Sequence, residues 1–369
     1  MIKLSTRTGA FCRGSYPQPV TRSELPRRSP SIGTYSHREG SRMSKKRLTV
    51  AVIGAGGNMR GAHVPRIERD GFARIVGAAD PVTEQIDRFT ERAGYEVPAF
   101  SDWREMLAET ESDAVFISTP HSDHHAQIKA CLDAGRHVLV EKPMVLTPAH
   151  ARATLRHAEQ AKRLLMVAYQ RHWMPEYVYA QELIRKGALG EIRGVVGYVT
   201  QNWGALGGWR LDPVKSGGGM YMDTGSHLLA SMLWMTGLQP SKVSATFDNA
   251  RRPVDINAAV QIAFKGGAVG TLTTIGNASR HDERLMISGS EGCLILHLHQ
   301  WQVRSMLLND EPVTAPKRIR PDTPDNALFR WIRTNGKGYE APEFALQVSR
   351  LTEASYRSAK EKAPVTVRR

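Results

Sequence analysis

The sequence predicts an α/β protein of two domains, and three observations support this prediction. A length of 369 residues favours two domains over one. Between residues 45 and 170, short apolar runs alternate with helix-like segments, which predicts a parallel sheet covered by helices on both faces. From residue 171 to residue 369 most strand-like runs follow one another without crossover helices, which predicts an antiparallel sheet.

The first 44 residues differ in composition from the rest of the chain. Residues 1–44 are rich in Ser, Arg, Pro and Gly and lack apolar periodicity, so they cannot bury enough surface to offset the entropy of ordering. Arg27 and Arg28 resemble a twin-arginine export signal, but no apolar stretch follows them. We expect a dispensable disordered tail, or translated sequence upstream of a start at Met43; the Arg and Ser content leaves a transit peptide open.

The first predicted domain, residues 45–170, alternates strands with helices. The expected strands are Leu48–Ile53, Arg74–Ala79, Ala114–Ser118, His137–Val140 and Leu164–Tyr169. The expected helices are Thr83–Ala93, Asp123–Ala134 and Pro148–Ala161. This order implies right-handed crossovers between parallel strands.

The second predicted domain, residues 171–369, is richer in strands. It begins with a helix over Pro175–Lys186 and ends with an amphipathic helix over Glu343–Lys360, and a further helix is expected at Asp223–Trp234. The expected strands are Ile192–Gln201, Lys242–Phe247, Ala258–Phe264, Val269–Ile275, Leu285–Ser288 and Cys293–Leu298.

Composition excludes several classes of protein. Apolar residues make up 41% and charged residues 23%, as in soluble globular proteins, and no run of 18 apolar residues predicts a membrane span. The net charge is +14, but residues 1–42 supply +6 of it and the rest is dispersed, so we expect no nucleic-acid partner. Cys12, Cys131 and Cys293 are far apart, which argues against a zinc site or disulfide framework and fits a reducing, cytoplasmic compartment.

Glycines follow the first predicted strand, in the segment that begins at Gly54. Gly54 permits a tight turn, and Gly56 removes a Cβ where a pyrophosphate would approach the backbone. The next helix would direct its free N–H groups at those phosphates. Met59 stands at the third glycine position of this pattern, so we expect the helix to lie slightly farther from the strand.

An acidic residue ends the second predicted strand. Asp80 follows Gly54 by 26 residues, and its carboxylate can accept hydrogen bonds from the hydroxyls of an adenosine ribose. The same carboxylate would repel a 2′-phosphate, and no Arg stands directly beside it in the sequence. NAD is therefore favoured over NADP. The alternative is that Asp80 only caps the helix after Pro81.

Two further strands end in chemically active residues. Ser118–His121 and Glu141–Pro143 follow neighbouring strands, and ligands of open α/β sheets bind beyond these carboxyl ends. Lys142 is placed to orient a substrate hydroxyl and help remove its proton. Taken alone, the same residue would be a surface lysine near a turn.

A second group of polar residues lies in the glycine-rich segment Gly217–His227. Asp223 and His227 are four apart, so they share a helix face, and the carboxylate would stabilise the protonated imidazole. The alternative is an N-cap at Asp223 and a structural His227. This spacing can also hold a metal, but no third ligand is near, and the histidine cluster at 121, 124 and 125 lacks a carboxylate or thiol, so no metal is expected.

Together these motifs resemble the glucose–fructose oxidoreductase / inositol dehydrogenase / rhizopine catabolism (Gfo/Idh/MocA) family, over about residues 47–360. The resemblance is carried by Gly54–Gly57, Ala79–Pro81, Thr119-Pro120 with His124, Glu141–Pro143, Gly187–Ile192, Trp209-Arg210 and Gly217–His227. It implies a Rossmann domain followed by an α/β domain on a large, mostly antiparallel open sheet, whose exposed face forms homodimers or homotetramers. It also implies Lys142, Asp223 and His227 as the catalytic set. Met59 and His121, the latter where Asn is frequent, depart from the family pattern, and His121 could alter nicotinamide contacts.

Binding residues are expected at the ends of the strands and at the start of the second domain. The cofactor residues are Gly54, Gly56, Gly57, Asn58, Met59, Asp80, Thr119, Pro120, His121, His124, Glu141 and Lys142. The substrate residues are Tyr169, Arg171, His172, Trp173, Trp209 and Arg210, which suit hydrogen bonding to hydroxyls and stacking on a sugar ring.

The expected function is that of an NAD-dependent dehydrogenase acting on a secondary alcohol of a sugar or cyclitol. Two alternatives stay open: an NAD-dependent enzyme that cleaves glycosides through transient oxidation, and a sensor that kept the fold without the chemistry. Release of an aglycone without net NADH would indicate the first alternative. The presence of Lys142, Asp223 and His227 argues against the second, because a sensor needs no proton transfer.

Overall fold

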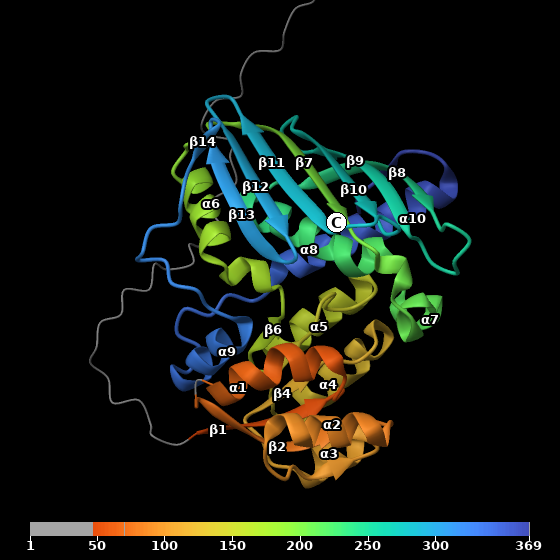
Figure 1. Ribbon diagram of the computed structural model, residues 1–369, viewed down its shortest axis with the longest axis vertical. Coiled ribbons are helices and arrows are strands. Elements are labelled where there is room, and N and C mark those ends of the chain that lie inside the picture. Colours follow the sequence, from red (N-terminus) through yellow and green to blue (C-terminus); the bar gives the residue numbers. More distant parts are fainter. Residues whose placement is uncertain (1–46, 70, 369) are drawn as a thin grey trace, which may run out of the picture. The chain divides into compact units, whose positions relative to one another are not determined.

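A computed structural model describes residues 47–69 and 71–368, and its first sheet is the predicted parallel one. The strand order is β3-β2-β1-β4-β5-β6, with every neighbouring pair parallel. Figure 1 labels four of these strands, β1, β2, β4 and β6. The strands are β1 (Leu48–Ile53), β2 (Ala73–Ala79), β3 (Ala99–Phe100), β4 (Ala114–Ile117), β5 (His137–Val140) and β6 (Leu165–Val167). The helices are α1 (Val64–Arg69), α2 (Thr83–Ala93), α3 (Trp103–Glu109), α4 (His124–Asp133) and α5 (Pro148–Ala161).

The central strands of this sheet are buried on both faces, which explains their uninterrupted apolar sequences. In β1, Val50 and Val52 belong to one hydrophobic cluster, whereas Ala51 and Ile53 belong to another. Successive side chains of a strand point to opposite faces, so the two clusters lie on the two sides of the sheet. The carboxyl ends of β1, β2, β4 and β5 therefore share one edge, where the predicted site residues lie.

The second sheet has nine strands in the order β14-β13-β12-β11-β7-β10-β9-β8-β15, and only the β7–β10 pair is parallel. The strands are β7 (Ile192–Thr200), β8 (Pro240–Asp248), β9 (Asn257–Phe264), β10 (Val269–Ile275), β11 (Asp282–Gly289), β12 (Cys293–His299), β13 (Gln302–Leu308), β14 (Glu311–Pro312) and β15 (Val365–Thr366). The predicted fold class, a Rossmann sheet plus a mostly antiparallel sheet, is confirmed.

One face of the nine-stranded sheet is covered by helices. In β9, Val260 and Ile262 are buried while Gln261 and Ala263 are exposed, the alternation expected of a sheet with one covered face. Figure 1 shows α8 (Met220–Thr236) and α10 (Glu343–Glu361) along the covered face. The helix α6 (Pro175–Arg185) packs against α8. The predicted homodimer or homotetramer stays a prediction.

A helix from the second half of the chain belongs to the first domain's core. The helix α9 (Pro324–Arg333) packs against α1, β5 and β6, and Phe329 stacks on Phe116 of β4 with ring centroids 5.6 Å apart. From the sequence, all of residues 171–369 are expected in the second domain, and α9 is not predicted. Its start nevertheless carries a helix signal, because Thr323 caps the N–H of Asn326 and Pro324 occupies the first turn.

The other predicted helices and strands are present, with ends shifted by a few residues. Besides α9, the elements not predicted from the sequence are α3, α7 (Pro213–Ser216), β3, β13, β14 and β15, most of which are short. The segment Met59–His63 forms a π-helical turn, and the Met59 side chain is fully buried in it. Among the described helices, none has the length and apolarity needed to cross a bilayer. The predictions for residues 1–44 and for Cys12 lie outside the described residues.

The packing of α9 gives a prediction for stability. Phe329→Ala removes a stacked ring from a buried cluster, so we expect the free energy of unfolding to fall by about 3–5 kcal/mol. Urea unfolding measures this change. Val214→Ala is the control, because Val214 is 77% exposed and its truncation should leave stability unchanged. A loss below about 1 kcal/mol for Phe329→Ala would show that α9 does not depend on this contact.

Candidate active site

The glycine turn after β1 has the shape of a dinucleotide cradle. Gly54 has φ +88°, and a Cβ there would lie 2.5 Å from the carbonyl oxygen of Ser118, so only glycine fits. At Gly56 and Gly57 a Cβ would meet nothing within 4 Å, so the backbone borders open space. The residues present therefore fit a pyrophosphate that approaches the main chain before the helical turn at Met59.

Asp80 is fixed beside this turn. Its Oδ2 accepts the N–H of Ala55 at 2.9 Å, and its Oδ1 accepts the N–H of Val82 at 3.0 Å. The capping alternative is wrong, because Val82 precedes α2 and no side chain caps the N–H groups of that helix; the Asp80 carboxylate instead fixes the turn over Pro81 and the glycine turn. A cation that the sequence analysis did not place here is also near: Arg60 donates to the Ala55 carbonyl at 2.7 Å and to Gln85 at 2.5 Å.

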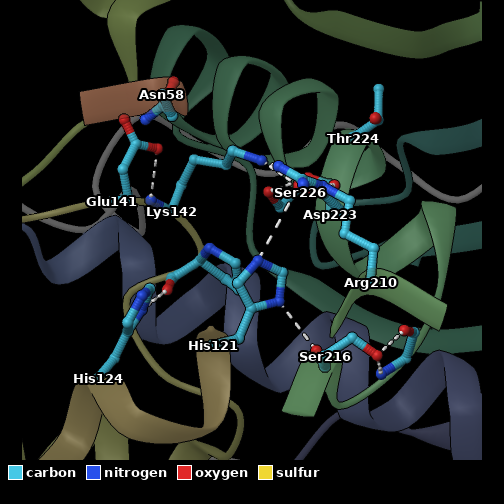
Figure 2. A network of polar contacts seen from close by, with 12 residues as sticks. Asn58, His121, His124, Glu141, Lys142, Arg210, Ser216, Asp223, Thr224 and Ser226 are labelled. Carbon is cyan, nitrogen blue, oxygen red and sulfur yellow. Dashed lines mark hydrogen bonds and ion pairs between the residues drawn. The ribbon is translucent and has the colours of Figure 1, made fainter. Parts of the chain in front are cut away.

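The central feature of the site is an ion pair between the two domains. The Nζ of Lys142, two residues after β5, donates to Oδ1 of Asp223, in the first turn of α8 (Figure 2). The other carboxylate oxygen, Oδ2, accepts the Trp203 indole N–H at 3.0 Å and Nε of Arg210 at 3.1 Å. Asp223 is only 5% exposed, so these contacts replace its hydration.

The charge of Asp223 follows from these partners. Burial on its own would raise the pKa of this carboxyl, but Lys142, His121 and Arg210 hold its pKa far below its ordinary value. The carboxylate is therefore ionised at every pH at which enzymes usually work. It fixes the Lys142 ammonium in a single direction.

His121 lies next to this ion pair. Its Nδ1 donates to the carbonyl oxygen of Ser216 at 2.8 Å, and its Nε2 is 4.0 Å from Oδ1 of Asp223. Its ring meets the edge of Trp209 with centroids 4.7 Å apart. Burial lowers the pKa of His121 to about 3, so the ring is neutral and its Nε2 lone pair faces the site.

His227 lies one helical turn after Asp223 and is 6% exposed. From the spacing alone, Asp223 is expected to stabilise the protonated imidazole. Asp223 does act in that direction, but burial, followed by the charges of Lys142 and Arg171, lowers the pKa of His227 well below its ordinary value. The ring is consequently neutral at pH 7.

Two predicted cofactor residues are fixed inside the protein. His124 is fully buried, with Nδ1 2.9 Å from the Pro143 carbonyl and Nε2 3.2 Å from the Thr119 carbonyl. It joins the two strand-end loops and supports their shape. Glu141 is buried as well, and its Oε2 accepts the Lys142 N–H at 3.2 Å. Neither side chain presents an exposed surface to a ligand.

The structure brings three of the predicted substrate residues to the site. Arg210 contacts Asp223, Trp209 contacts His121, and the buried Tyr169 ring faces His227 at a centroid distance of 6.1 Å.

The other three predicted substrate residues lie in the turn Gln170–Trp173, where Arg171 and His172 are buried and Trp173 is partly exposed. Arg171 makes a two-point ion pair with Glu283, which is 0% exposed. His172 stacks on Trp234 with centroids 4.4 Å apart, and Trp173 packs against Trp331 of α9.

Two tryptophans that the sequence analysis missed also border the site. Trp203 binds Asp223, as described above. Trp301, in the turn between β12 and β13, is 45% exposed and lies 5.6 Å from the His227 ring and 4.9 Å from the His281 ring. A tryptophan in a polar hairpin turn is the signal that could have identified Trp301. Within the described residues, no group of three or more His, Cys, Asp or Glu is arranged to hold a metal.

Comparison with known proteins identifies the family. The sequence model described as "Oxidoreductase family, NAD-binding Rossmann fold" matches residues 48–169, and the one described as the GFO/IDH/MocA C-terminal domain matches residues 177–295. The chain belongs to the Gfo/Idh/MocA family of oxidoreductases, as its motifs predicted. Its first domain is an NAD(P)-binding Rossmann domain.

Individual relatives are distant. The D-xylose 1-dehydrogenase [NADP(+)] of Haloarcula marismortui is 28% identical over 226 residues, which cover 58% of this chain and 62% of that protein, less than two thirds of its length. The aldose–aldose oxidoreductase of Caulobacter crescentus, solved with glycerol, is 25% identical, with a TM-score of 0.77 over 87% of this chain and 100% of that chain. GenD2 from gentamicin A biosynthesis, solved with NAD, is 25% identical, with a TM-score of 0.77 over 89% and 99%.

The burial of Arg171 gives a prediction. Arg171→Met leaves the Glu283 carboxylate buried without its cation, so we expect a loss of about 3–5 kcal/mol in the free energy of unfolding. Urea unfolding measures the loss, and the double variant Arg171→Met/Glu283→Leu should recover most of it. Unchanged stability with a raised KM would instead assign Arg171 to substrate binding.

Proposed function

We propose that this protein is an NAD-dependent dehydrogenase that oxidises a secondary alcohol of a sugar, sugar derivative or cyclitol, or reduces the matching ketone. The observation that carries the proposal is the ion pair between the partly buried Lys142 and the buried Asp223 at the carboxyl edge of the Rossmann sheet, with His227 one helical turn away. The distant relatives described above support it, because they include a sugar dehydrogenase and an aldose oxidoreductase.

The glycine turn and the edge of the first sheet would hold the cofactor. Gly54, Gly56 and Gly57 admit the pyrophosphate, and Asp80 receives the adenosine ribose hydroxyls. When bound, the nicotinamide ring supplies the acceptor or donor of the hydride. Thr119 and Pro120, like Lys142, follow strands whose carboxyl ends border that region.

The side chains of this chain would handle the proton. Lys142, held by Asp223, donates a hydrogen bond to the substrate oxygen and stabilises negative charge that develops on it. His227 is neutral, so its ring can accept the hydroxyl proton during oxidation and return it during reduction. Asp223 does not transfer a proton in this scheme, because its two oxygens already accept from Lys142, Trp203 and Arg210.

The aromatic residues around these groups suit a ring-shaped substrate. Trp209 is partly exposed and contacts the His121 ring. Trp301 is also partly exposed and contacts the His227 ring. Large aromatic side chains left in contact with water are suited to cover the apolar face of a sugar ring, while Arg210 is suited to hydroxyl groups.

The catalytic assignment predicts a loss of rate. Lys142→Ala and His227→Asn should each lower kcat by about 10²–10⁴-fold, because each removes a positioned group that interacts with the reacting hydroxyl. The rate is measured by NADH absorbance with a sugar or cyclitol that the wild-type protein oxidises, and NADH affinity should change far less than kcat. His125→Asn, on α4 and hydrogen-bonded to Thr154, is the control and should keep full activity.

The pH profile refines this prediction. His227 must be neutral to accept a proton, and its pKa in the folded protein lies below 6.5, so its protonation should not reduce the oxidation rate between pH 8 and pH 6.5. The limb due to His227 should fall at lower pH. Near wild-type turnover in both Lys142→Ala and His227→Asn would contradict the mechanism.

The position of Asp80 predicts cofactor preference. The wild-type protein should show a higher kcat/KM with NAD than with NADP, because the carboxylate repels a 2′-phosphate. Asp80→Ser/Pro81→Arg should improve kcat/KM for NADP relative to NAD by about tenfold or more, since a cation replaces an anion. A wild-type preference for NADP would contradict the assignment and direct attention to Arg60.

A further inference from the structure

We propose that His63 is a positioning residue, which holds Glu141 and thereby the backbone of Lys142 in the orientation that the nicotinamide end of the cofactor requires. The proposal rests on the proposed binding of a nicotinamide cofactor at this edge. It adds a residue from the turn before α1, and a partner from α9, to a site that the sequence analysis placed in other segments.

The geometry around His63 is that of a bridge between two carboxylates. Nδ1 lies 2.7 Å from Oδ1 of Asp325, and Nε2 lies 3.1 Å from Oε1 of Glu141. His63 and Asp325 are both 0% exposed, and Glu141 is 7% exposed. The edge of the His63 ring also meets Phe116 of β4, so apolar packing fixes its plane.

Each ring nitrogen faces a carboxylate oxygen, so both must carry a proton and the ring is an imidazolium. Burial alone would lower the pKa of His63, but Asp325 and Glu141 together raise it to about 9. Arg66 supplies the second cation, with Nη1 3.1 Å from Oδ2 of Asp325. The two positive charges, on His63 and Arg66, balance the two negative charges, on Asp325 and Glu141. His63 and Asp325 have no contact with water.

Stability alone is a weak reason for such a network. Replacing a buried ion pair with apolar residues of similar volume is often neutral or stabilising, so the charged groups are better explained by the orientation they impose. The His63 imidazolium fixes the Glu141 carboxylate in one rotamer, because its contact with Asp325 on the opposite side prevents the ring from turning.

Glu141 passes this orientation to Lys142. The Oε2 of Glu141 accepts the Lys142 N–H at 3.2 Å, and the Asn58 side chain also hydrogen-bonds to Glu141. Figure 2 shows Glu141 between Asn58 and Lys142, with the Lys142 side chain extended toward Asp223. A continuous series of contacts therefore runs from Asp325 on α9, through His63 and Glu141, to the Lys142–Asp223 pair.

The experiment compares two ligands that differ at the nicotinamide end. NADH binding is followed by its fluorescence, and binding of ADP-ribose, which lacks nicotinamide, is followed by calorimetry. In His63→Gln, which removes the imidazolium that contacts Glu141, the Kd for NADH should rise by about tenfold, the scale expected for loss of one hydrogen bond to a charged group. The Kd for ADP-ribose should stay within about twofold, because the glycine turn and Asp80 are untouched.

A matched control and a milder variant complete the test. His137→Asn changes a histidine at the opposite end of β5, where Nδ1 accepts the N–H of Leu164, and should alter neither Kd. Asp325→Asn keeps the size of the side chain and should raise the Kd for NADH in the same direction, so it carries the test if His63→Gln does not fold. The kcat of either variant should fall along with NADH affinity.

Equal weakening of NADH and ADP-ribose in the His63 or Asp325 variants would show a merely structural network and overturn the proposal. Unchanged affinity for both ligands would overturn it as well. These outcomes leave the proposed dehydrogenase function standing, because wild-type binding is unaffected. Failure of the wild-type protein to bind NADH or NADPH at all would contradict the proposed function, and this inference with it.

Discussion

The ion pair between Lys142 and Asp223 is the interaction on which the rest of the site depends. It joins a loop at the carboxyl edge of the Rossmann sheet to the first turn of a helix that packs on the nine-stranded sheet. Two desolvated charges are retained in a protein only when their partners are well placed, and here Trp203 and Arg210 satisfy the second carboxylate oxygen. The ammonium of Lys142 is thus held in one direction before any substrate binds.

The surrounding residues act on this pair from both domains. His121 lies beside it and His227 follows Asp223 by one helical turn, and both rings are neutral because burial lowers the pKa of each. Behind Lys142, the buried Glu141 accepts the backbone N–H and is itself held by His63, which connects the loop to α9. A late segment of the chain therefore contributes to the core beneath the proposed cofactor site. Rigid support of this kind is what a catalytic group needs to keep its geometry.

Much of this arrangement was predictable from local sequence patterns. Strand–helix alternation predicted the parallel sheet, and the strand ends identified Lys142 because ligands bind beyond such ends. Helix spacing placed Asp223 and His227 on one helix, but it could not predict which cation would pair with the Asp223 carboxylate. Arg171 is buried because it pairs with Glu283, and α9 returns to the first domain because it packs on Phe116. Each partner is more than a hundred residues away in the sequence, and periodicity does not reveal such contacts.

The central claim, that Asp223 is paired with Lys142 and not with His227, is tested most directly by double-mutant cycles on the free energy of unfolding. We predict that Lys142→Met and Asp223→Asn are each destabilising and that the double variant loses at least 1 kcal/mol less than the sum of the two, the coupling of a direct contact. We predict that the coupling between Asp223→Asn and His227→Asn is smaller than that of the first cycle, because the His227 ring is neutral. Additive effects in the first cycle together with strong coupling in the second would contradict the account.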